Sequence, residues 1–138
     1  MERMRKLAVA TAMLAGSALL GGCMTDGPTS AEQLAAYQAN AGEPVDKIRY
    51  FSPIGWDKVD DEHIVVTMRP SEQYLMRLSG PCLDFAGGAP VIAISSQAGY
   101  VSAKFDRVTA SGSSMSCRIE EIRPVDVRAM RGDQVSGT

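Results

Sequence analysis

The sequence predicts a mainly β protein: a small antiparallel β-barrel or sandwich of five to six strands, with one short N-terminal helix and one disulfide. Three observations support this fold class. Short alternating or β-branched segments recur between residues 45 and 122. Clusters of Gly, Pro and Ser separate them, as turns separate the strands of small β proteins. Two cysteines, Cys82 and Cys117, lie in the same region and provide a candidate crosslink.

Residues 1–22 are typical of a lipoprotein signal peptide. Three cations, Arg3, Arg5 and Lys6, precede an uncharged stretch rich in Ala and Leu that covers 7–20. A helix that spans a bilayer needs roughly 20 apolar residues, and this stretch is shorter. A basic start, a short apolar segment and small residues at its end describe a secretory signal peptide rather than a membrane-spanning helix.

The end of this segment, Leu20-Gly21-Gly22-Cys23, resembles the bacterial lipobox. The resemblance implies that the Cys23 thiolate takes a diacylglyceryl group and that the chain is cut between Gly22 and Cys23. Each buried methylene contributes about 0.8 kcal/mol, so two or three acyl chains anchor a protein stably. Met24 follows Cys23 where an Asp would favour the inner membrane, which indicates the periplasmic face of the outer membrane. The alternative is an ordinary signal peptide, or a buried N-terminal helix, with an incidental cysteine.

The predicted mature chain, 23–138, is long enough for one domain with a modest core. It carries 11 Lys and Arg residues against 15 Asp and Glu residues, because the leader holds three of the chain's 14 cations and one of its 16 anions. This acidic balance, without a basic patch, argues against nucleic acid as a partner. The expected partners are the membrane, through the N-terminal lipid, and a protein of the envelope. No cofactor is expected.

A tether and a short helix are predicted over 23–46. The pattern Ser30-Ala31-Glu32-Gln33 is that of a capping box, and Ala-rich sequence continues to Asn40. Leu34 and Tyr37 are three residues apart and share one face of the helix. The apolar stripe is thin, so the helix is expected either to dock on the edge of the domain or to fray.

A β-rich domain is predicted over 47–125, with the pattern of strands beginning at Val45. The β-branched segment "IVVTM" and the alternating segment "YLMRL" form a predicted hairpin. Later in the chain, Val101, Ala103 and Phe105 alternate along one predicted strand, which residues 107–110 are expected to continue with a bend near Asp106. The segment "SPIGW" is expected to be a turn. The predicted strands are 45–50, 64–68, 74–78, 91–95, 100–110 and 116–122.

The last predicted strand carries a break in its alternation. Cys117 and Ile119 share a face, whereas Ile122 is out of phase with them, which predicts a β-bulge near Glu120-Glu121. Pro124 is expected to end the pairing, since proline lacks the N–H that a ladder needs. Residues 126–138 are polar and contain Gly, and they are expected to form a loose tail.

Cys82 and Cys117 are predicted to form the disulfide, because the periplasm oxidises thiols and two cysteines remain after lipidation. The bond would close a loop of roughly 36 residues, for which the chain-entropy model gives about 4 kcal/mol. The alternative is a redox-active or metal-binding thiol pair. The sequence has no C-x-x-C motif and a single His, which favours the structural bond.

Two residues are candidates for ligand binding, His63 and Trp56. His63 follows Asp60, Asp61 and Glu62, and these side chains could bind a metal or act as acid and base. Neighbouring residues of a strand point to opposite faces, so a solvated turn that leads into a strand is the favoured interpretation. Trp56, the single Trp, is either a stacking platform for a ligand or part of the core. No catalytic or metal-binding set is predicted.

The order of these features is similar to a family of short Gram-negative envelope lipoproteins classed as a domain of unknown function. The resemblance covers roughly Ile48 to Val125, supports the domain boundaries and the cysteine pair, and implies no activity. The residues that carry it are Ile48-Arg49, Trp56, His63-Ile64-Val65-Val66, Tyr74-Leu75, Leu78-Ser79-Gly80-Pro81-Cys82, Ile92, Asp106 and Cys117-Arg118-Ile119.

The sequence therefore predicts a lipid-anchored envelope protein that is a non-catalytic binding or interaction module. The alternative is a small metal- or ligand-dependent periplasmic enzyme that uses the His63 region.

Overall fold

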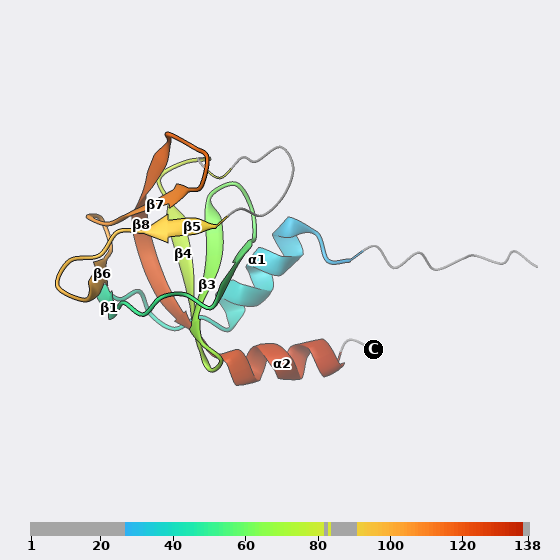
Figure 1. Cartoon of the computed structure of the whole chain (residues 1–138). Helices are drawn as coiled ribbons and strands as arrows, with labels where there is room; N and C mark the ends of the chain where they lie inside the picture. The colour runs from blue at the N-terminus through green and yellow to red at the C-terminus, as the bar shows by residue number, and fades with distance from the viewer. Residues whose placement is uncertain (1–26, 82, 84–90, 137–138) are drawn as a thin grey trace, which may run out of the picture.

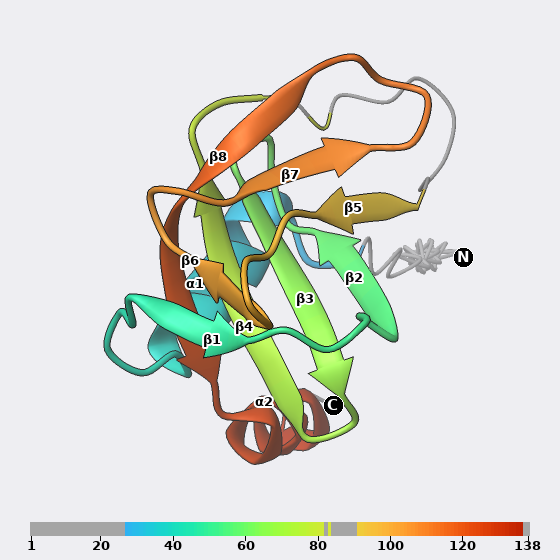
Figure 2. The ribbon, with the colours of Figure 1, turned by 60° about the vertical axis from the view of Figure 1, so that its left-hand side comes forward.

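The computed structural model describes residues 27–81, 83 and 91–136, and this part of the chain is mainly β, as predicted. Six antiparallel strands form a curled sheet in the order β2-β3-β4-β8-β7-β5, and β1 pairs with β6 in a small second sheet (Figures 1 and 2). The elements are α1 (Ser30–Ala39), β1 (Lys47–Arg49), β2 (Gly55–Lys58), β3 (His63–Arg69), β4 (Glu72–Leu78), β5 (Ile92–Ile94), β6 (Tyr100–Ser102), β7 (Arg107–Ala110), β8 (Ser116–Val125) and α2 (Val127–Ser136).

The main core lies on one face of the curled sheet, here called the inner face. Alternation along β3 places Ile64, Val66 and Met68 on this face, and all three are buried. The small sheet covers them, because Ile48 of β1 and its partner Val101 of β6 belong to the same core. Burial of each such side chain stabilises the fold by roughly 1.5–3 kcal/mol. The remaining buried members of this core are Met76, Leu78, Leu83, Ile94, Val108, Ala110, Cys117, Ile119 and Ile122.

The opposite face of the sheet, here called the helix face, carries a second and smaller cluster. Val65, Leu75 and Val125 are buried there and pack against Leu34 and Tyr37 of α1 and against Met130 of α2, together with Val59. Figure 1 shows both helices on this side of β3 and β4. The predicted stripe of Leu34 and Tyr37 thus docks the first helix, although no residue of α1 is buried.

The predicted bulge in β8 is confirmed by the strand register. Arg77 of β4 lies opposite Glu121, and the next residue, Leu78, lies opposite Ile119, so Glu120 has no partner in the β4 ladder. The extra residue restores Ile122 to the inner face with Cys117 and Ile119.

Pro124 does not end the pairing, contrary to the prediction. It lies opposite Tyr74, and β8 continues to Val125. The carbonyl oxygen of Pro124 accepts a hydrogen bond from the Gly42 N–H at 2.8 Å, on the side of β8 away from β4. Because the N and O of one strand residue point to the same side, the missing proline N–H leaves the ladder with β4 intact.

The chain bends near Asp106, as predicted, but the strand expected over 100–110 is interrupted at residues 103–106. β6 ends at Ser102 and β7 begins at Arg107, with Lys104 between them at φ 70°. Phe105, expected on a sheet face, is 80% exposed, whereas Asp106 is 3% exposed. The Asp106 carboxylate accepts hydrogen bonds from the Ser102 N–H and the Ser95 hydroxyl, both at 2.6 Å, and these contacts hold the turn.

Two further segments differ from the sequence expectation. The segment "SPIGW", expected to be a turn, contributes Gly55 and Trp56 to β2. The expected tail over 126–138 contains α2. Asp126 explains this helix, because its Oδ1 accepts hydrogen bonds from the N–H groups of Arg128 and Ala129, both at 3.0 Å. This is the geometry of an N-cap, a role that a sequence scan for apolar periodicity does not detect.

Neither α1 nor α2, the helices of the described part, has the length and apolar character needed to cross a bilayer.

Tyr74 gives the β3–β4 hairpin a pH dependence. Its hydroxyl donates to Glu72 Oε1 at 2.7 Å; burial, and then this bond and the charge of Glu72, raise the pKa of Tyr74 to about 12. An unfolded Tyr titrates near 10. Between about pH 10 and 12 the unfolded chain releases a proton that the native chain keeps, so stability falls as pH rises through this window.

We expect urea unfolding to show a steeper loss of stability between pH 10 and 12 in the unchanged chain than in Tyr74→Phe. Absorbance titration of the tyrosinates should lack its last step in the variant. An identical pH dependence in both chains would contradict the assignment.

Candidate functional site

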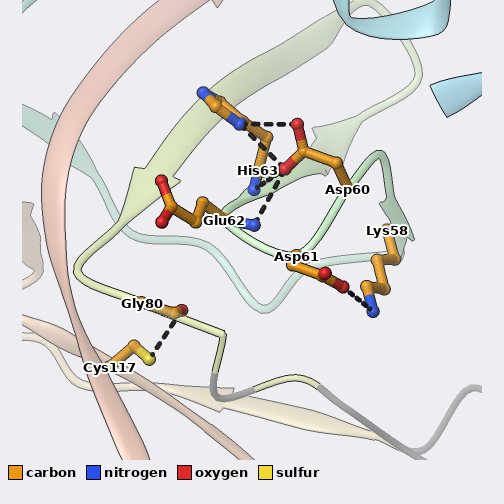
Figure 3. A network of polar contacts seen from close by, with 7 residues as sticks. All are labelled: Lys58, Asp60, Asp61, Glu62, His63, Gly80 and Cys117. Atoms are coloured by element: carbon orange, nitrogen blue, oxygen red, sulfur yellow. Dashed lines mark hydrogen bonds and ion pairs between the residues drawn. The ribbon is translucent and has the colours of Figure 1, made fainter. Parts of the chain in front are cut away.

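The acidic segment before His63 is a tight polar turn between β2 and β3. Asp60 organises it, because Oδ1 accepts the N–H groups of Glu62 and His63 at 2.8 and 2.7 Å. The same carboxylate faces the imidazole, and its two oxygens lie 2.9 and 3.0 Å from His63 Nδ1 (Figure 3). Asp60 therefore fixes both the backbone of the turn and the orientation of the ring.

The electrostatics of Asp60 reflect these contacts. Partial burial alone would raise its pKa, but the hydrogen bonds from the Glu62 N–H and from the ring and N–H of His63 outweigh it, and the net pKa is lowered. The carboxylate is thus charged at neutral pH and 29% exposed, beside an imidazole that is 14% exposed. An oriented imidazole of this kind can act as a hydrogen-bond donor or a base.

The other acidic side chains of the turn do not converge on His63. The Asp61 carboxylate pairs with Lys58 Nζ at 2.9 Å, and Figure 3 shows it directed away from the imidazole. Glu62 takes part through its carbonyl oxygen, which accepts the Leu78 N–H at 2.7 Å. Within the described ranges no three His, Cys, Asp or Glu side chains form a group that could hold a metal ion.

Trp56 and His63 lie on opposite faces of the sheet. Trp56 stands opposite Val66 in the β2–β3 register, which places it on the inner face, where it packs against the main core. His63 alternates with Ile64 and shares the helix face with Val65. The two candidate ligand-binding residues therefore do not form one site, and a ligand role for either one stays a prediction.

A hollow lies elsewhere in the described part of the chain, between α1, β2 and α2, and is here called the helix cleft. It has a volume of about 500 Å³. Tyr37 is half-buried at its wall, and burial, then the charge of Asp57, raise the pKa of this tyrosine. The lining residues are Pro28, Gln33, Ala36, Tyr37, Asp57, Lys58, Val59 and Met130.

The sequence indicated only the wall of the helix cleft that α1 forms. The stripe of Leu34 and Tyr37 indicated an apolar helix face, but Met130 belongs to the segment expected to be a tail. Neither His63 nor Trp56 lines the cleft.

Of the three cysteines, Cys117 lies in the part of the chain that the structure describes. Cys23 and Cys82 lie outside the described residues, so lipidation and the disulfide stay predictions. Cys117 is buried on β8, and its Sγ lies 3.1 Å from the carbonyl oxygen of Gly80 (Figure 3).

A family model matches residues 4–136, which is most of the chain. The chain belongs to a family of unknown function, DUF6491. No match is found among curated proteins or among solved structures. The DUF6491 match is longer than the resemblance over Ile48 to Val125 that the sequence indicated. It includes most of the predicted leader, α1 and all of α2, so both helices that pack on the sheet belong to the family unit.

Proposed function

We propose that this DUF6491 protein is anchored by lipid at Cys23 to the periplasmic face of the outer membrane and that its β-rich domain is a non-catalytic binding module. Two observations support the anchor. The lipobox-like Leu20-Gly21-Gly22-Cys23 ends an apolar leader, and the family match runs from residue 4 through that leader into the domain. A helix capped by Thr29 begins close behind it, so the domain would follow the anchor on a short tether.

We expect Cys23→Ser to remove the protein from the membrane fraction of cells, because serine cannot form the thioether. Loss of two or three acyl chains removes the interaction that holds it to the bilayer. The measurement is fractionation with metabolic labelling by a fatty acid, and Cys117→Ser is the matched control that keeps Cys23. A Cys23→Ser protein that still sediments with membranes would contradict the anchor.

The binding role rests on the arrangement of His63 and the helix cleft. Asp60 uses its carboxylate on the turn as well as on the imidazole, which is the pattern of a structural turn. The helix cleft, in contrast, is open, half apolar and built from segments far apart in the sequence. Open, largely preformed hollows of this size are typical binding sites.

A photo-reactive residue at Asp57, on the rim of the helix cleft, tests the binding role in intact cells. We expect a recurrent adduct from this position and none from the same probe at Phe105, which is 80% exposed in the β6–β7 turn. The absence of any adduct at position 57 across growth conditions would count against a binding module that uses this cleft.

A small periplasmic enzyme is the second candidate, favoured by the contact between Asp60 and His63 Nδ1. A carboxylate that orients an imidazole is the arrangement found behind general bases. His63→Ala and His63→Gln distinguish the enzyme from the non-catalytic module. If the protein is an enzyme that uses His63, cells that carry either variant should show the phenotype of cells without the protein. If His63 only stabilises the turn, both variants should keep their function in cells and lose only stability. Unchanged phenotype and metal content in both variants would exclude the enzyme.

A further inference from the structure

We propose that the helix cleft faces the membrane and binds a zwitterionic phospholipid of the bilayer. This inference rests on the proposed lipid anchor at Cys23 and names the ligand of the proposed binding module.

The length of chain between the anchor and the cleft limits where the cleft can lie. Four residues, 24–27, separate the predicted lipid-bearing position 23 from Pro28, which itself lines the cleft. An extended chain spans at most about 3.6 Å per residue, so the steps from position 23 to position 28 cover at most about 18 Å. The cleft edge at Pro28 is therefore held near the bilayer surface whatever the conformation of the tether.

The walls of the helix cleft suit an acyl chain. Ala36 and Tyr37 of α1, Val59 after β2 and Met130 of α2 form its apolar part. No residue of α1 is buried, so Ala36 and Tyr37 keep accessible surface at the wall of the cleft. An open apolar hollow beside a bilayer gains free energy when a hydrocarbon chain displaces its water. Methionine and tyrosine suit this position, because Met adapts its shape and Tyr combines an apolar ring with a polar tip.

The rim of the cleft carries charges of both signs. Asp57 and Lys58 are exposed at one end. Lys58 pairs with the exposed Asp61, a contact that is worth little in water and can be exchanged for a phosphate. Beyond Tyr37 and Met130, a smaller hollow of about 170 Å³ reaches Arg131, which is exposed. Cations for a phosphate and a carboxylate for an ammonium match a zwitterionic headgroup, whereas a purely anionic one would meet repulsion from Asp57.

Quenching by brominated lipid tests the proposal on the acylated full chain in vesicles. Tyr37→Trp combined with Trp56→Phe places the single tryptophan in the cleft, and the unchanged chain, with Trp56 on the inner face, is the matched control. In phosphatidylcholine vesicles with bromine on the acyl chains, we expect the tryptophan at position 37 to lose most of its emission. Trp56 should keep most of its emission.

The possible outcomes separate this inference from the anchor on which it rests. A protein that sediments with vesicles but shows no quenching at position 37 overturns the inference and leaves the anchor intact. Blue-shifted but unquenched emission of the tryptophan at position 37 means that an acyl chain of the protein's own anchor fills the cleft. This result also overturns the inference. A protein that does not sediment refutes the anchor and the inference together.

Hydrogen exchange of the unsubstituted acylated protein provides a second test that needs no variant of the cleft. We expect the amides of α1 to exchange more slowly on phosphatidylcholine vesicles than in the Cys23→Ser protein free in buffer. The amides of β6, in the small sheet that covers the inner face, should exchange alike in both. Equal exchange of α1 in the two states would overturn the inference.

Discussion

Asp106→Ala is expected to lower the free energy of unfolding by about 3 kcal/mol, because it removes a buried carboxylate that accepts two short hydrogen bonds. Asp106 is the buried charged residue of the described part, and its carboxylate accepts the Ser95 hydroxyl and the Ser102 N–H, both at 2.6 Å. Hydrogen bonds to a charged group contribute more than neutral ones, roughly 1.5–3 kcal/mol each, and the alanine side chain can replace neither of these two.

The position of Asp106 in the fold explains why the effect should be large. Ser95 follows β5, Ser102 ends β6, and Asp106 precedes β7, so one carboxylate connects three strands. The backbone of Asp106 adds a link to β8, because its carbonyl oxygen accepts the Ile119 N–H at 2.9 Å. Loss of the carboxylate should therefore loosen the small sheet against the main one.

Urea unfolding followed by circular dichroism measures the effect. Asp106→Asn keeps one acceptor oxygen and should lose less stability than Asp106→Ala. Asp57→Ala removes an exposed carboxylate and should remain within about 0.5 kcal/mol of the unchanged chain. If Asp106→Ala is as stable as Asp57→Ala, the network contributes nothing and the account of this turn is wrong.

The central strands could be predicted because their side chains alternate strictly. Ile64, Val66 and Met68 mark the inner face of β3, and the phase change between Ile119 and Ile122 marked the bulge in β8. In such strands a shift of one residue would turn the whole apolar set to the wrong face, so the pattern determines the register.

Prediction failed where one polar contact outweighs the local pattern. Val101, Ala103 and Phe105 alternate correctly for a strand, but the bonds to the Asp106 carboxylate bend the chain and expose Phe105. Asp126 likewise starts a helix in a polar segment. Each contact depends on where a single oxygen lies in space, which composition and periodicity do not specify.

The candidate site shows the same limit. Trp56 and His63 are close in sequence, yet the register of Trp56 opposite Val66 places them on opposite faces. The helix cleft joins residues from near 30, near 58 and at 130, which meet through the packing of two helices on the sheet. A single sequence carries the apolar stripe of each helix but not their meeting point.

Removal of the predicted Cys82–Cys117 bond is expected to have the largest effect, a loss of about 4 kcal/mol for a closed loop of roughly 36 residues. The described residues on either side of position 82 lie beside Cys117 or in the main core. Gly80, whose carbonyl oxygen lies 3.1 Å from Cys117 Sγ, is two residues away, and Leu83 on the other side is 1% exposed in the main core.

The test uses protein exported to the periplasm in the Cys23→Ser background, so that only two thiols remain. We expect no titratable thiol without reductant and a fall in the urea midpoint on full reduction. Cys82→Ala combined with Cys117→Ala should unfold at the midpoint of the reduced protein and be insensitive to reductant. Resistance to mild reductant would exclude a thiol switch, since structural disulfides resist the glutathione pool whereas regulatory ones do not. Two free thiols in the exported protein would refute the bond, and the small core would then have to hold this domain without a crosslink.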